Sequence, residues 1–418
     1  MSLHVLRGMR DILPPETHLW QEVEAKARQF FSLYGYEEIR TPILEEMGLF
    51  TRSIGEATNV VEKEMYVFQD RKEKWVALRP EGTASVVRAY IESNRVQQEM
   101  VARYYYLGPM YRYERPQLGR YRQFHQIGVE VFGIASPRLD AEVINMMDGF
   151  FRKKMELPDV TLEINSLGCT LCRPKFQNAF LHFLSQHEAA LCGDCKRRME
   201  KNPLRVLDCK EEGCQQVTTT APSIQEFLCE VCERDFDQVL ETLGVFGTAY
   251  RVNPKIVRGL DYYLKTTFEF TTTALGAQNA LAGGGRYDGL VRLMGGSNVP
   301  GFGCALGLER LVEVIKTLRT PSTTRCGLFI ITLGEKALIE ALTLSSQLRA
   351  KGHAVQMDYE GKSLKSQMRL ADKLGIRHVL ILGDDELKKK QVAVRDMLTQ
   401  EQMEIPIGEV ASRLATSV

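Results

Sequence analysis

The sequence lacks any long apolar segment. Its first residues, MSLHVLRGMRD, contain no apolar run of signal-peptide length, and no stretch approaches the uninterrupted apolar length of a membrane span. A membrane-spanning helix needs about 20 mostly apolar residues, and a secretory signal needs an apolar stretch near its start. We therefore expect a cytoplasmic protein with no membrane partner.

The sequence also lacks an excess of either charge. It carries 54 lysines and arginines against 53 aspartates and glutamates, which gives a formal net charge of +1. Any polyanion must therefore be bound by a local patch, because a general basic field is absent. There is no internal repeat and no low-complexity tail. With 418 residues, 44% of them hydrophobic, the chain can form two to four domains with a large core.

Cysteine is scarce outside one region. Eight of the ten cysteines fall between Cys169 and Cys232, which in a reducing compartment favours metal binding or free thiols over disulfides. They form three C-x-x-C pairs and one looser pair: Cys169/Cys172, Cys192/Cys195, Cys229/Cys232 and Cys209/Cys214. Eight thiolates suffice for one or two tetrahedral structural Zn²⁺ sites, but small subdomains also use reduced cysteines for packing. The spacing does not say which pairs combine.

Apolar periodicity predicts an α+β first domain, in which helices pack on an antiparallel sheet. Helices are expected from Pro14 to Gly35 and at 82–92 and 140–154. Strands are expected at 36–40, 75–78, 103–110, 126–132, 266–273 and 280–290, and a strand running into a helix at 301–311. We assign residues 1–160 and 254–320 to this domain. Residues 161–253, with the cysteine pairs and charged helices, form a predicted insertion.

A polar linker at 320–326 leads to a second pattern, in which strands and helices alternate. This alternation predicts a separate α/β domain at 326–418 with a parallel sheet. Its helix at 363–374 would have a buried side made of Leu364, Met368 and Ala371. The opposite side carries a basic stripe at spacing four, made of Lys365, Arg369 and Lys373. Such a stripe suits nucleic-acid phosphates, although it can equally be a solvated face.

Arginine is concentrated on one predicted hairpin, residues 111–133, YRYERPQLGRYRQFHQIGVEVFG. Arg112 is expected on the first strand. Gln126 and Glu130 on the return strand share a face, which Gly128 leaves open. Guanidinium groups pair with phosphate oxygens, and an aromatic such as Phe124 can stack on a base. The alternative is an exposed hairpin with ordinary surface ion pairs.

Four shorter motifs add candidates of lower specificity. RPEGT at 79–83 places Glu81 beside a helix start, where it can cap the helix or bind an ammonium group. RGLDYY at 258–263 offers an arginine and two tyrosines, although paired tyrosines are more often half-buried strand residues. GGGRYDGL at 283–290 exposes backbone to a ligand or forms a turn. GFGCALGLERL at 301–311 puts Arg310 in an early helical turn, where it reaches a phosphate or pairs with Glu309 or Glu313.

Taken in this order, the motifs resemble class II aminoacyl-tRNA synthetases, and specifically the histidyl-tRNA synthetase family. RGMRDILPPE at 7–16 is similar to the family's N-terminal segment, and EIRTPILEE, with Pro42, resembles the dimer-forming motif 1. The hairpin at 111–133 resembles motif 2, and residues 301–311 resemble motif 3. RGLDYY and GGGRYDGL resemble the two peptides that distinguish the histidine enzymes. The resemblance covers nearly the whole chain.

The resemblance implies an ATP site on the hairpin. Arg112 would contact the α-phosphate and Arg310 the γ-phosphate. Glu114 and Phe124 would contact the adenine, and Arg120 the nucleotide or the tRNA acceptor end. Mg²⁺ would accompany the ATP and assist departure of pyrophosphate.

A histidine site is implied as well. Its ammonium end would be held by Glu81, Thr83 and Gln126, with Gly82 and Tyr262 completing the pocket. Its imidazole would be read by Glu130 and Tyr263, since a carboxylate and a phenol can pair with both ring nitrogens. Arg258 would lie beside the reacting carboxylate and α-phosphate, and with Arg112 and Arg310 would form the catalytic set.

The implied reaction activates L-histidine with ATP and transfers it to the 3′ end of tRNA-His. The family also implies a homodimer, recognition of the extra 5′ guanosine of tRNA-His, and a C-terminal anticodon-binding domain. One rival is the non-catalytic, histidine-sensing regulatory paralogue of ATP phosphoribosyltransferase, which the complete arginine set and the C-terminal domain disfavour. Another is a synthetase for proline or threonine, neither of which needs an imidazole reader.

Overall fold

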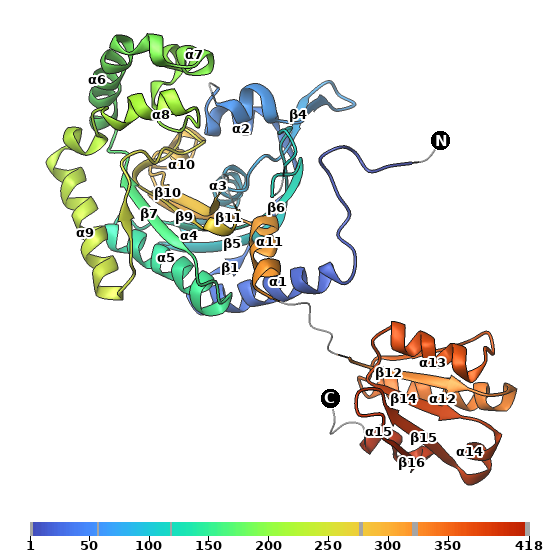
Figure 1. Cartoon of the computed structure of the whole chain (residues 1–418). Helices are drawn as coiled ribbons and strands as arrows, with labels where there is room; N and C mark the ends of the chain where they lie inside the picture. Colours follow the sequence, from blue (N-terminus) through green and yellow to red (C-terminus); the bar gives the residue numbers. More distant parts are fainter. Residues whose placement is uncertain (1–2, 57, 118, 276–278, 320–324, 414–418) are drawn as a thin grey trace. The chain divides into compact units, whose positions relative to one another are not determined.

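The computed structural model of the chain describes residues 3–56, 58–117, 119–275, 279–319 and 325–413. It divides into two compact units, Met1–Leu318 and Arg319–Val418 (Figure 1). Residues 320–324 of the predicted polar linker lie outside the described residues. Among the helices of the described ranges, none has the length and apolar character to cross a membrane.

The first unit is built around one eight-stranded sheet. In spatial order its strands are β1 (Glu37–Glu38), β5 (Ala102–Tyr111), β6 (Gln123–Phe132), β11 (Gly301–Gly307), β10 (Ala280–Arg286), β9 (Leu264–Thr271), β7 (Thr161–Ser166) and β8 (Arg251–Val252). The predicted antiparallel pairing is confirmed for the six central strands. It is wrong at both edges, where the two-residue strands β1 and β8 pair in parallel. The chain reaches these edges by long connections, which do not impose hairpin geometry.

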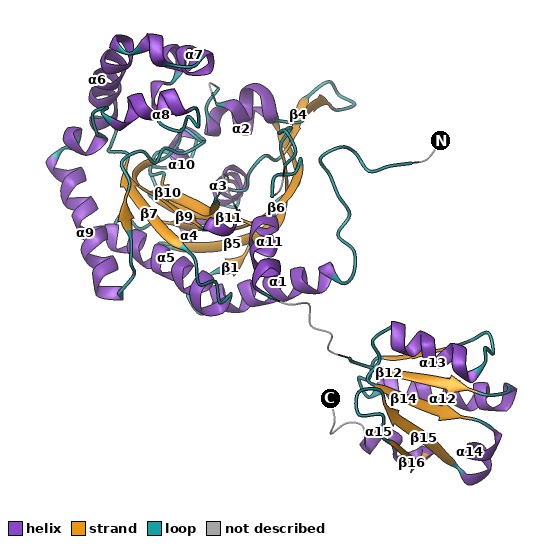
Figure 2. Cartoon of the chain, viewed as in Figure 1, coloured by secondary structure: helices purple, strands orange, loops and turns teal. Residues whose placement is uncertain are grey.

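Four long helices cover one face of this sheet (Figure 2). They are α1 (Glu16–Ser32), α5 (Pro137–Gly149), α9 (Glu230–Phe246) and α11 (Leu308–Leu318). Their apolar sides meet strand residues such as Val129 and Phe302 in the main core. The predicted helix at 140–154 is confirmed, because α5 is extended by a helical turn at Phe150–Lys154.

The opposite face of the sheet carries α3 (Thr83–Glu92) and a second apolar cluster. Alternation along β5 sends Tyr105 into the main core and Tyr104 and Tyr106 into this second cluster. A three-stranded sheet lies nearby, made of β2 (Leu44–Glu46), β4 (Trp75–Leu78) and β3 (Val67–Gln69). Three further helices complete this side: α2 (Met47–Ile54), α4 (Arg95–Gln98) and α10 (Leu290–Leu293).

The cysteine-rich region folds between β7 and β8. It contains α6 (Cys172–Gln186), α7 (Gly193–Lys201) and α8 (Glu212–Thr219), followed by α9, and has its own small core around Phe176 and Phe180. The predicted Cys-rich insertion is therefore present as a helical subdomain. The two ends of the predicted range 161–253 differ from the prediction, because β7 and β8 lie within it but belong to the large sheet.

The second unit has a five-stranded sheet of order β13 (Val355–Met357), β12 (Leu328–Thr332), β14 (His378–Leu382), β15 (Gln391–Asp396) and β16 (Gln402–Pro406). Its helices are α12 (Glu335–Ala350), α13 (Leu364–Lys373), α14 (Asp384–Lys389) and α15 (Val410–Arg413). The prediction of a parallel sheet holds only for β12, β13 and β14. β14 pairs antiparallel with β15, and β15 with β16, since the connection through the short helix α14 and the following hairpin are too short for a crossover.

The buried side of α13 also differs from the prediction. Leu364 is 41% exposed at the start of the helix, whereas Gln367 is fully buried. The Gln367 side-chain amide donates to the backbone carbonyl of Thr332 (2.9 Å) and accepts from its N–H (3.1 Å). A polar residue occupies the core here because it completes hydrogen bonds at the end of β12. Met368 and Ala371 face inward as predicted.

Candidate active site

A cavity of about 280 Å³ opens on the α3 face of the large sheet. Most of the predicted site residues line it: Glu81, Thr83, Arg112, Glu114, Arg120, Phe124, Gln126, Arg258, Tyr262, Tyr263 and Arg310. Gly82 and Glu130 are not among the described residues that line it. Side chains far apart in sequence therefore meet in a single hollow.

Arg112 and Arg310 are held in the cavity by backbone carbonyls. Arg112 follows directly after β5, one residue beyond its predicted place on the strand, and its Nε donates to Pro80 O (2.8 Å). Arg310 donates through Nη1 to Ala280 O (2.6 Å) and through Nε to Gly119 O (3.3 Å). Burial lowers the pKa of Arg310, and the nearby Arg120 lowers it further. A bound anion would therefore favour the charged form of the buried Arg310 guanidinium.

The alternative reading of Arg310 as a surface ion-pair residue is wrong. Glu309 is 3% exposed and both of its oxygens accept the backbone N–H of His125 at 2.9 Å. Glu313 binds Lys316 at 3.0 Å instead. Both carboxylates are engaged elsewhere, so the Arg310 guanidinium is left for the cavity.

Arg258 lies against β9 and β10. Its guanidinium pairs with Glu269 and lies 5.7 Å from the ring centre of Tyr263. Burial lowers the pKa of Arg258, but Glu269, Tyr263, Tyr262 and Asp208 together outweigh this effect and the net pKa is raised. Gly283 makes room for the group, since a Cβ there would lie 2.3 Å from Arg258 Nη1. The absence of a side chain at Gly283 thus leaves space for the Arg258 guanidinium.

The hairpin loop is organised as part of the cavity wall. Glu114 forms an ion pair with Arg120 (Oε2 to Nη1, 3.1 Å), and the Arg112 guanidinium lies 5.3 Å from the ring centre of Phe124. Arg115, on the same loop, is exposed and lines no part of the cavity. The loop therefore combines inward-facing arginines with at least one solvent-facing arginine.

Glu81 caps α3 in this structure. Its two oxygens accept the backbone N–H groups of Thr83 (2.7 Å) and Ala84 (2.8 Å). Burial raises its pKa, although these N–H groups oppose the shift. The capping role considered from sequence is confirmed. It does not compete with ligand binding, because each carboxylate oxygen has a second lone pair.

Glu130 lies behind the cavity floor and is fully buried. Its Oε1 accepts from the Thr83 hydroxyl (2.6 Å), and its Oε2 accepts from the Tyr287 hydroxyl. Burial raises its pKa to about 8, against the opposing effect of the two hydroxyl donors. Glu130 therefore reaches the cavity only past Thr83.

The expectation that Gly128 leaves the sheet face open is wrong. A Cβ at Gly128 would lie 2.1 Å from the ring of Tyr106, the residue paired with it on β5. Gly82 makes room for the same ring, at 2.3 Å. The Tyr106 ring fills the space that side chains at Gly82 and Gly128 would occupy. The local sequence pattern did not predict this contact.

Three residues at or beside the site had no predicted role there: Glu269, Tyr287 and Glu309. Tyr287 lies within GGGRYDGL and Glu309 next to Arg310, so a closer reading of those motifs could have found them. Glu269 carries no local signal. It is an alternating polar residue of β9, and only the folded structure places it next to Arg258.

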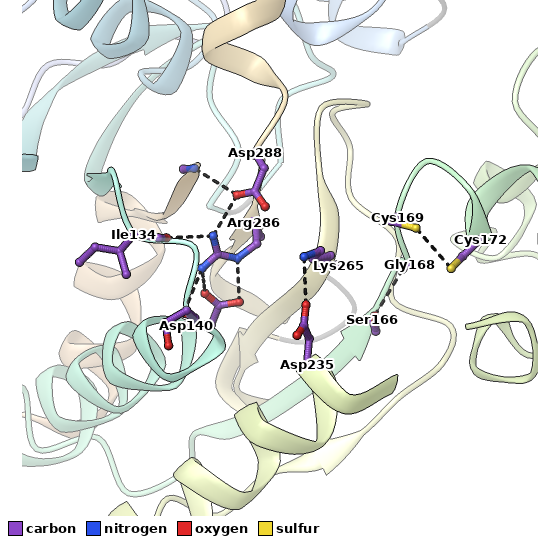
Figure 3. A network of polar contacts seen from close by, with 12 residues as sticks. Ile134, Asp140, Ser166, Gly168, Cys169, Cys172, Asp235, Lys265, Arg286 and Asp288 are labelled. Atoms are coloured by element: carbon purple, nitrogen blue, oxygen red, sulfur yellow. Dashed lines mark hydrogen bonds and ion pairs between the residues drawn. The ribbon is translucent and has the colours of Figure 1, made fainter. Parts of the chain in front are cut away.

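A buried ion network supports the strand that carries Gly283. Arg286 at the end of β10 is 1% exposed and pairs with Asp140 of α5 and with Asp288 (2.9 Å to Nη1). It also donates to Ile134 O at 3.1 Å (Figure 3). The network ties GGGRYDGL to the helical layer behind the sheet.

The insertion's cysteines fall into two groups of four that could each hold a metal ion. The first is Cys169, Cys172, Cys229 and Cys232, and the second is Cys192, Cys195, Cys209 and Cys214. Within each group the Sγ atoms lie within 4.8 Å of one another. All eight are free thiols.

Two family models match the chain. One described as histidyl-tRNA synthetase matches residues 8–311, and one described as an anticodon-binding domain matches residues 328–416. A histidine–tRNA ligase of Geobacter sulfurreducens is 51% identical over 411 residues, covering 98% of this chain and 99% of that relative. One of Desulfatibacillum aliphaticivorans is 47% identical over 416 residues, with 100% and 99% covered.

Solved structures give the same grouping. The apo histidyl-tRNA synthetase of S. aureus matches with a TM-score of 0.82 at 34% identity, covering 99% of both chains. A Bacillus halodurans protein described as an ATP phosphoribosyltransferase regulatory subunit/histidyl-tRNA synthetase has a TM-score of 0.67 at 20% identity, covering 92% of this chain and 99% of that one. The second likeness concerns the fold alone.

Proposed function

The chain belongs to the histidyl-tRNA synthetase family, and we propose that the cavity on the α3 face is where it activates histidine with ATP. Its activity is that of a histidine–tRNA ligase, which forms histidyl-adenylate and transfers histidine to the 3′ end of tRNA-His. The observation that carries the proposed location is the convergence of Arg112, Arg258 and Arg310 on one cavity with Glu81 and Tyr263.

ATP would occupy the side of the cavity formed by the hairpin. Arg112 and Arg310 are anchored by carbonyls and keep N–H groups for the α- and γ-phosphates, respectively. The adenine would lie between Phe124 and Glu114, and Arg120 would contact the nucleotide or the acceptor end of tRNA. Positioned cations of this kind lower the barrier because they match the charge that develops on phosphorus oxygens.

Histidine would occupy the side formed by α3 and the RGLDYY peptide. Glu81, Thr83 and Gln126 would hold its ammonium group, near Gly82 and Tyr262. Its imidazole would contact the Tyr263 hydroxyl and reach Glu130 by replacing the Thr83 hydroxyl at Oε1. A pocket with such buried polar groups rejects apolar isosteres, which would leave those groups unpaired.

Arg258 would promote the chemical step by charge stabilisation. The histidine carboxylate is already a nucleophile, so no general base is needed for its attack on the α-phosphorus. The Glu269 carboxylate holds the Arg258 guanidinium in place. A fixed cation beside the reacting carboxylate would align it and stabilise the transition state, and pyrophosphate would leave opposite the attacking oxygen.

We also propose that Mg²⁺ binds with ATP in this cavity. The carboxylates of Glu269 and Glu309 line it, and oxygen donors are the ligands that Mg²⁺ prefers. Glu309 is kept in position by His125. When bound, Mg²⁺ would neutralise charge on the β- and γ-phosphates and so help pyrophosphate to leave. For the insertion we propose structural zinc.

A homodimer and a cytoplasmic location complete the proposal. Large apolar side chains are exposed on the three-stranded sheet, at Leu44, Phe68 and Trp75. Leu44 and the exposed Ile43 lie in the segment that resembles the dimer-forming motif, and burying such a patch would stabilise a pair of chains. The cytoplasm supplies both ATP and tRNA.

Pyrophosphate exchange tests the proposal directly. We expect exchange with histidine and none with proline or threonine. Arg112→Ala should lower kcat/KM for ATP about 100-fold or more, because it removes a charge-assisted contact in the transition state. Arg115→Ala, a loop arginine outside the cavity, is the matched control and should stay within about twofold. Absence of histidine-dependent exchange would instead favour the regulatory paralogue.

A further inference from the structure

The pairing of the insertion's cysteines, which the sequence left open, follows a nested pattern. The first C-x-x-C pair meets the last, forming the outer cluster of Cys169, Cys172, Cys229 and Cys232. The two middle pairs meet each other, forming the inner cluster of Cys192, Cys195, Cys209 and Cys214. The outer cluster closes the base of the insertion, and the inner cluster lies within the loop that it closes.

The sulfur spacing fits one tetrahedral ion in each cluster. With Zn–S bonds of about 2.3 Å, sulfurs at the corners of a tetrahedron are about 3.8 Å apart. The Sγ atoms of Cys169 and Cys172 are 3.5 Å apart, and those of Cys192 and Cys209 are 3.9 Å apart. A disulfide would bring two sulfurs to about 2.05 Å. An iron–sulfur cluster would spread them further, because its inorganic core lies between them.

Backbone groups around the sulfurs favour thiolates. The N–H of Cys229 donates to Cys172 Sγ (3.2 Å), and the N–H of Leu171 donates to Cys169 Sγ (3.4 Å). In the inner cluster the N–H of Cys192 donates to Cys214 Sγ (3.2 Å). These bonds supply the supporting shell that metal-bound sulfur usually has.

Helix geometry points the same way. Cys172 is the first residue of α6, and Cys195, Cys214 and Cys232 lie in the first turns of α7, α8 and α9, respectively. The N-terminus of a helix carries partial positive charge and lowers the cost of a thiolate. Four helices thus begin at the two clusters.

Packing alone does not account for the arrangement. Cys195 and Cys214 are buried in the insertion's small apolar core, as a packing role would require. Cys169, Cys192 and Cys229 are only partly buried, and each still turns its sulfur toward three others. Partly exposed thiols gain little by packing but are common as metal ligands.

The outer cluster adjoins the RGLDYY peptide, the segment assigned above to histidine. Leu167 N donates to Lys265 O (2.7 Å) and Lys265 N donates to Gly168 O (2.8 Å), directly before Cys169. Arg173, directly after Cys172, donates to the carbonyls of Asp261 (3.2 Å) and Tyr263 (3.4 Å).

A second chain of contacts runs from the other half of the outer cluster. Asp235, three residues after Cys232, pairs with Lys265 Nζ at 3.0 Å (Figure 3). Residues flanking both halves of the outer cluster therefore hold the segment that follows Tyr263. The inner cluster's part of the insertion contacts the first part of the RGLDYY peptide, through Asn202 Nδ2 to Asp261 Oδ1 (3.1 Å) and Arg205 Nη2 to Gly259 O (2.5 Å).

We propose that each cluster binds one Zn²⁺ through four thiolates, and that the outer ion positions the RGLDYY peptide for histidine binding. The positioning role of the outer ion rests on the proposed function, whereas zinc binding by the two clusters does not. The ions are structural, since four protein ligands leave no open coordination position. The residues of the outer cluster are positioning residues and do not contact substrate.

Metal content of the purified full-length protein tests the sites. We expect two zinc ions per chain. Cys229→Ser/Cys232→Ser and Cys192→Ser/Cys195→Ser should each lose one, and Cys326→Ser, an exposed cysteine outside both clusters, should keep both. After exchange into Co²⁺, the parent should show the charge-transfer and d–d bands of two tetrathiolate centres. Zinc-free protein, iron–sulfur absorbance or intramolecular disulfides in freshly purified protein would overturn the assignment.

Kinetics test the positioning role. The outer-cluster double variant should raise KM for histidine in pyrophosphate exchange by about tenfold or more, with KM for ATP within about twofold. A variant that merely unfolds would lose both substrates together, so chelation of zinc from the parent followed by zinc add-back provides a second measurement. Unchanged KM for histidine in zinc-depleted protein would overturn the role. Parent protein that holds two zinc ions but exchanges with no amino acid would overturn the proposed function and leave the sites intact.

Discussion

Glu130 shows how one buried side chain makes the protein sensitive to pH. It has no solvent exposure, and its pKa is raised from its ordinary 4.5 to about 8 by burial. The folded protein therefore keeps this proton up to about pH 8, whereas the unfolded chain releases it near pH 4.5. Between these values the folded state binds more protons, so Glu130 makes stability fall as pH rises.

We expect Glu130→Gln to remove this pH-dependent loss of stability. The free energy of unfolding of the variant, relative to the parent, should rise between pH 5 and pH 8 by at most about 1.4 kcal/mol per pH unit. Urea unfolding at several pH values measures it. Glu241→Gln, at an exposed position of α9, is the control and should show a flat difference. A flat difference for Glu130→Gln as well would contradict the raised pKa.

Gly283 is important because it has no side chain. We expect Gly283→Ala to push the Arg258 guanidinium aside, because the new methyl would lie 2.3 Å from Nη1. A misplaced catalytic group costs about 100-fold in rate, so kcat/KM for pyrophosphate exchange should fall by about that factor. The melting temperature should change little, since the obstructed group is a side-chain end. Gly289→Ala, which meets no atom within 4 Å, should leave exchange unchanged.

At the scale of elements, the Arg286–Asp140 pair joins β10 to α5 at a point where both side chains are 1% exposed. Arg286→Met should lower the free energy of unfolding by about 3–5 kcal/mol, because it leaves the buried Asp140 carboxylate without its opposite charge. The double variant Arg286→Met/Asp140→Leu should recover much of this loss. Chemical denaturation measures both.

A solvent-exposed pair provides the comparison. Arg40, whose side chain is 78% exposed, pairs with Glu38 at 2.6 Å. Arg40→Met should change stability by less than about 1 kcal/mol. Equal effects for Arg286→Met and Arg40→Met would show that the buried network contributes no more than a surface pair.

The elements themselves were largely predictable. Alternation in TTFEFTTT and apolar spacing around Leu19 and Phe30 are local signals, and β9 and α1 formed where they indicated. Prediction failed where a partner decides the outcome. The direction of β15 depends on its neighbour β14, and the burial of Gln367 depends on the open backbone groups of Thr332.

At the scale of the whole molecule, the first unit matches a histidyl-tRNA synthetase model and the second an anticodon-binding domain, so we expect activation in the first unit and tRNA binding in the second. The α13 stripe of Lys365, Arg369 and Lys373 is exposed, as the sequence predicted. Replacing all three by alanine should weaken tRNA binding and lower the slope of log affinity against log salt by about 2 to 3, at about 0.7–0.9 per phosphate contact. Pyrophosphate exchange, which needs no tRNA, should be unchanged.

Three exposed lysines elsewhere on the same unit, Lys336, Lys351 and Lys388, provide the matched control. Their alanine replacements remove the same charge from other positions. An equal loss of tRNA affinity in the control would mean that the stripe acts only as part of the general charge of the unit.

The sequence by itself determined most of the strands and helices, since periodicity is a local property of a chain, and the resemblance of its short motifs to one family pointed to most of the cavity residues. Only the tertiary structure decided that Glu130 sits behind Thr83, that Tyr106 fills the space above Gly128, and that the outermost cysteine pairs meet each other. Each of these depends on a neighbour that is distant along the chain. Packing selects that neighbour, and no local pattern of residues encodes it.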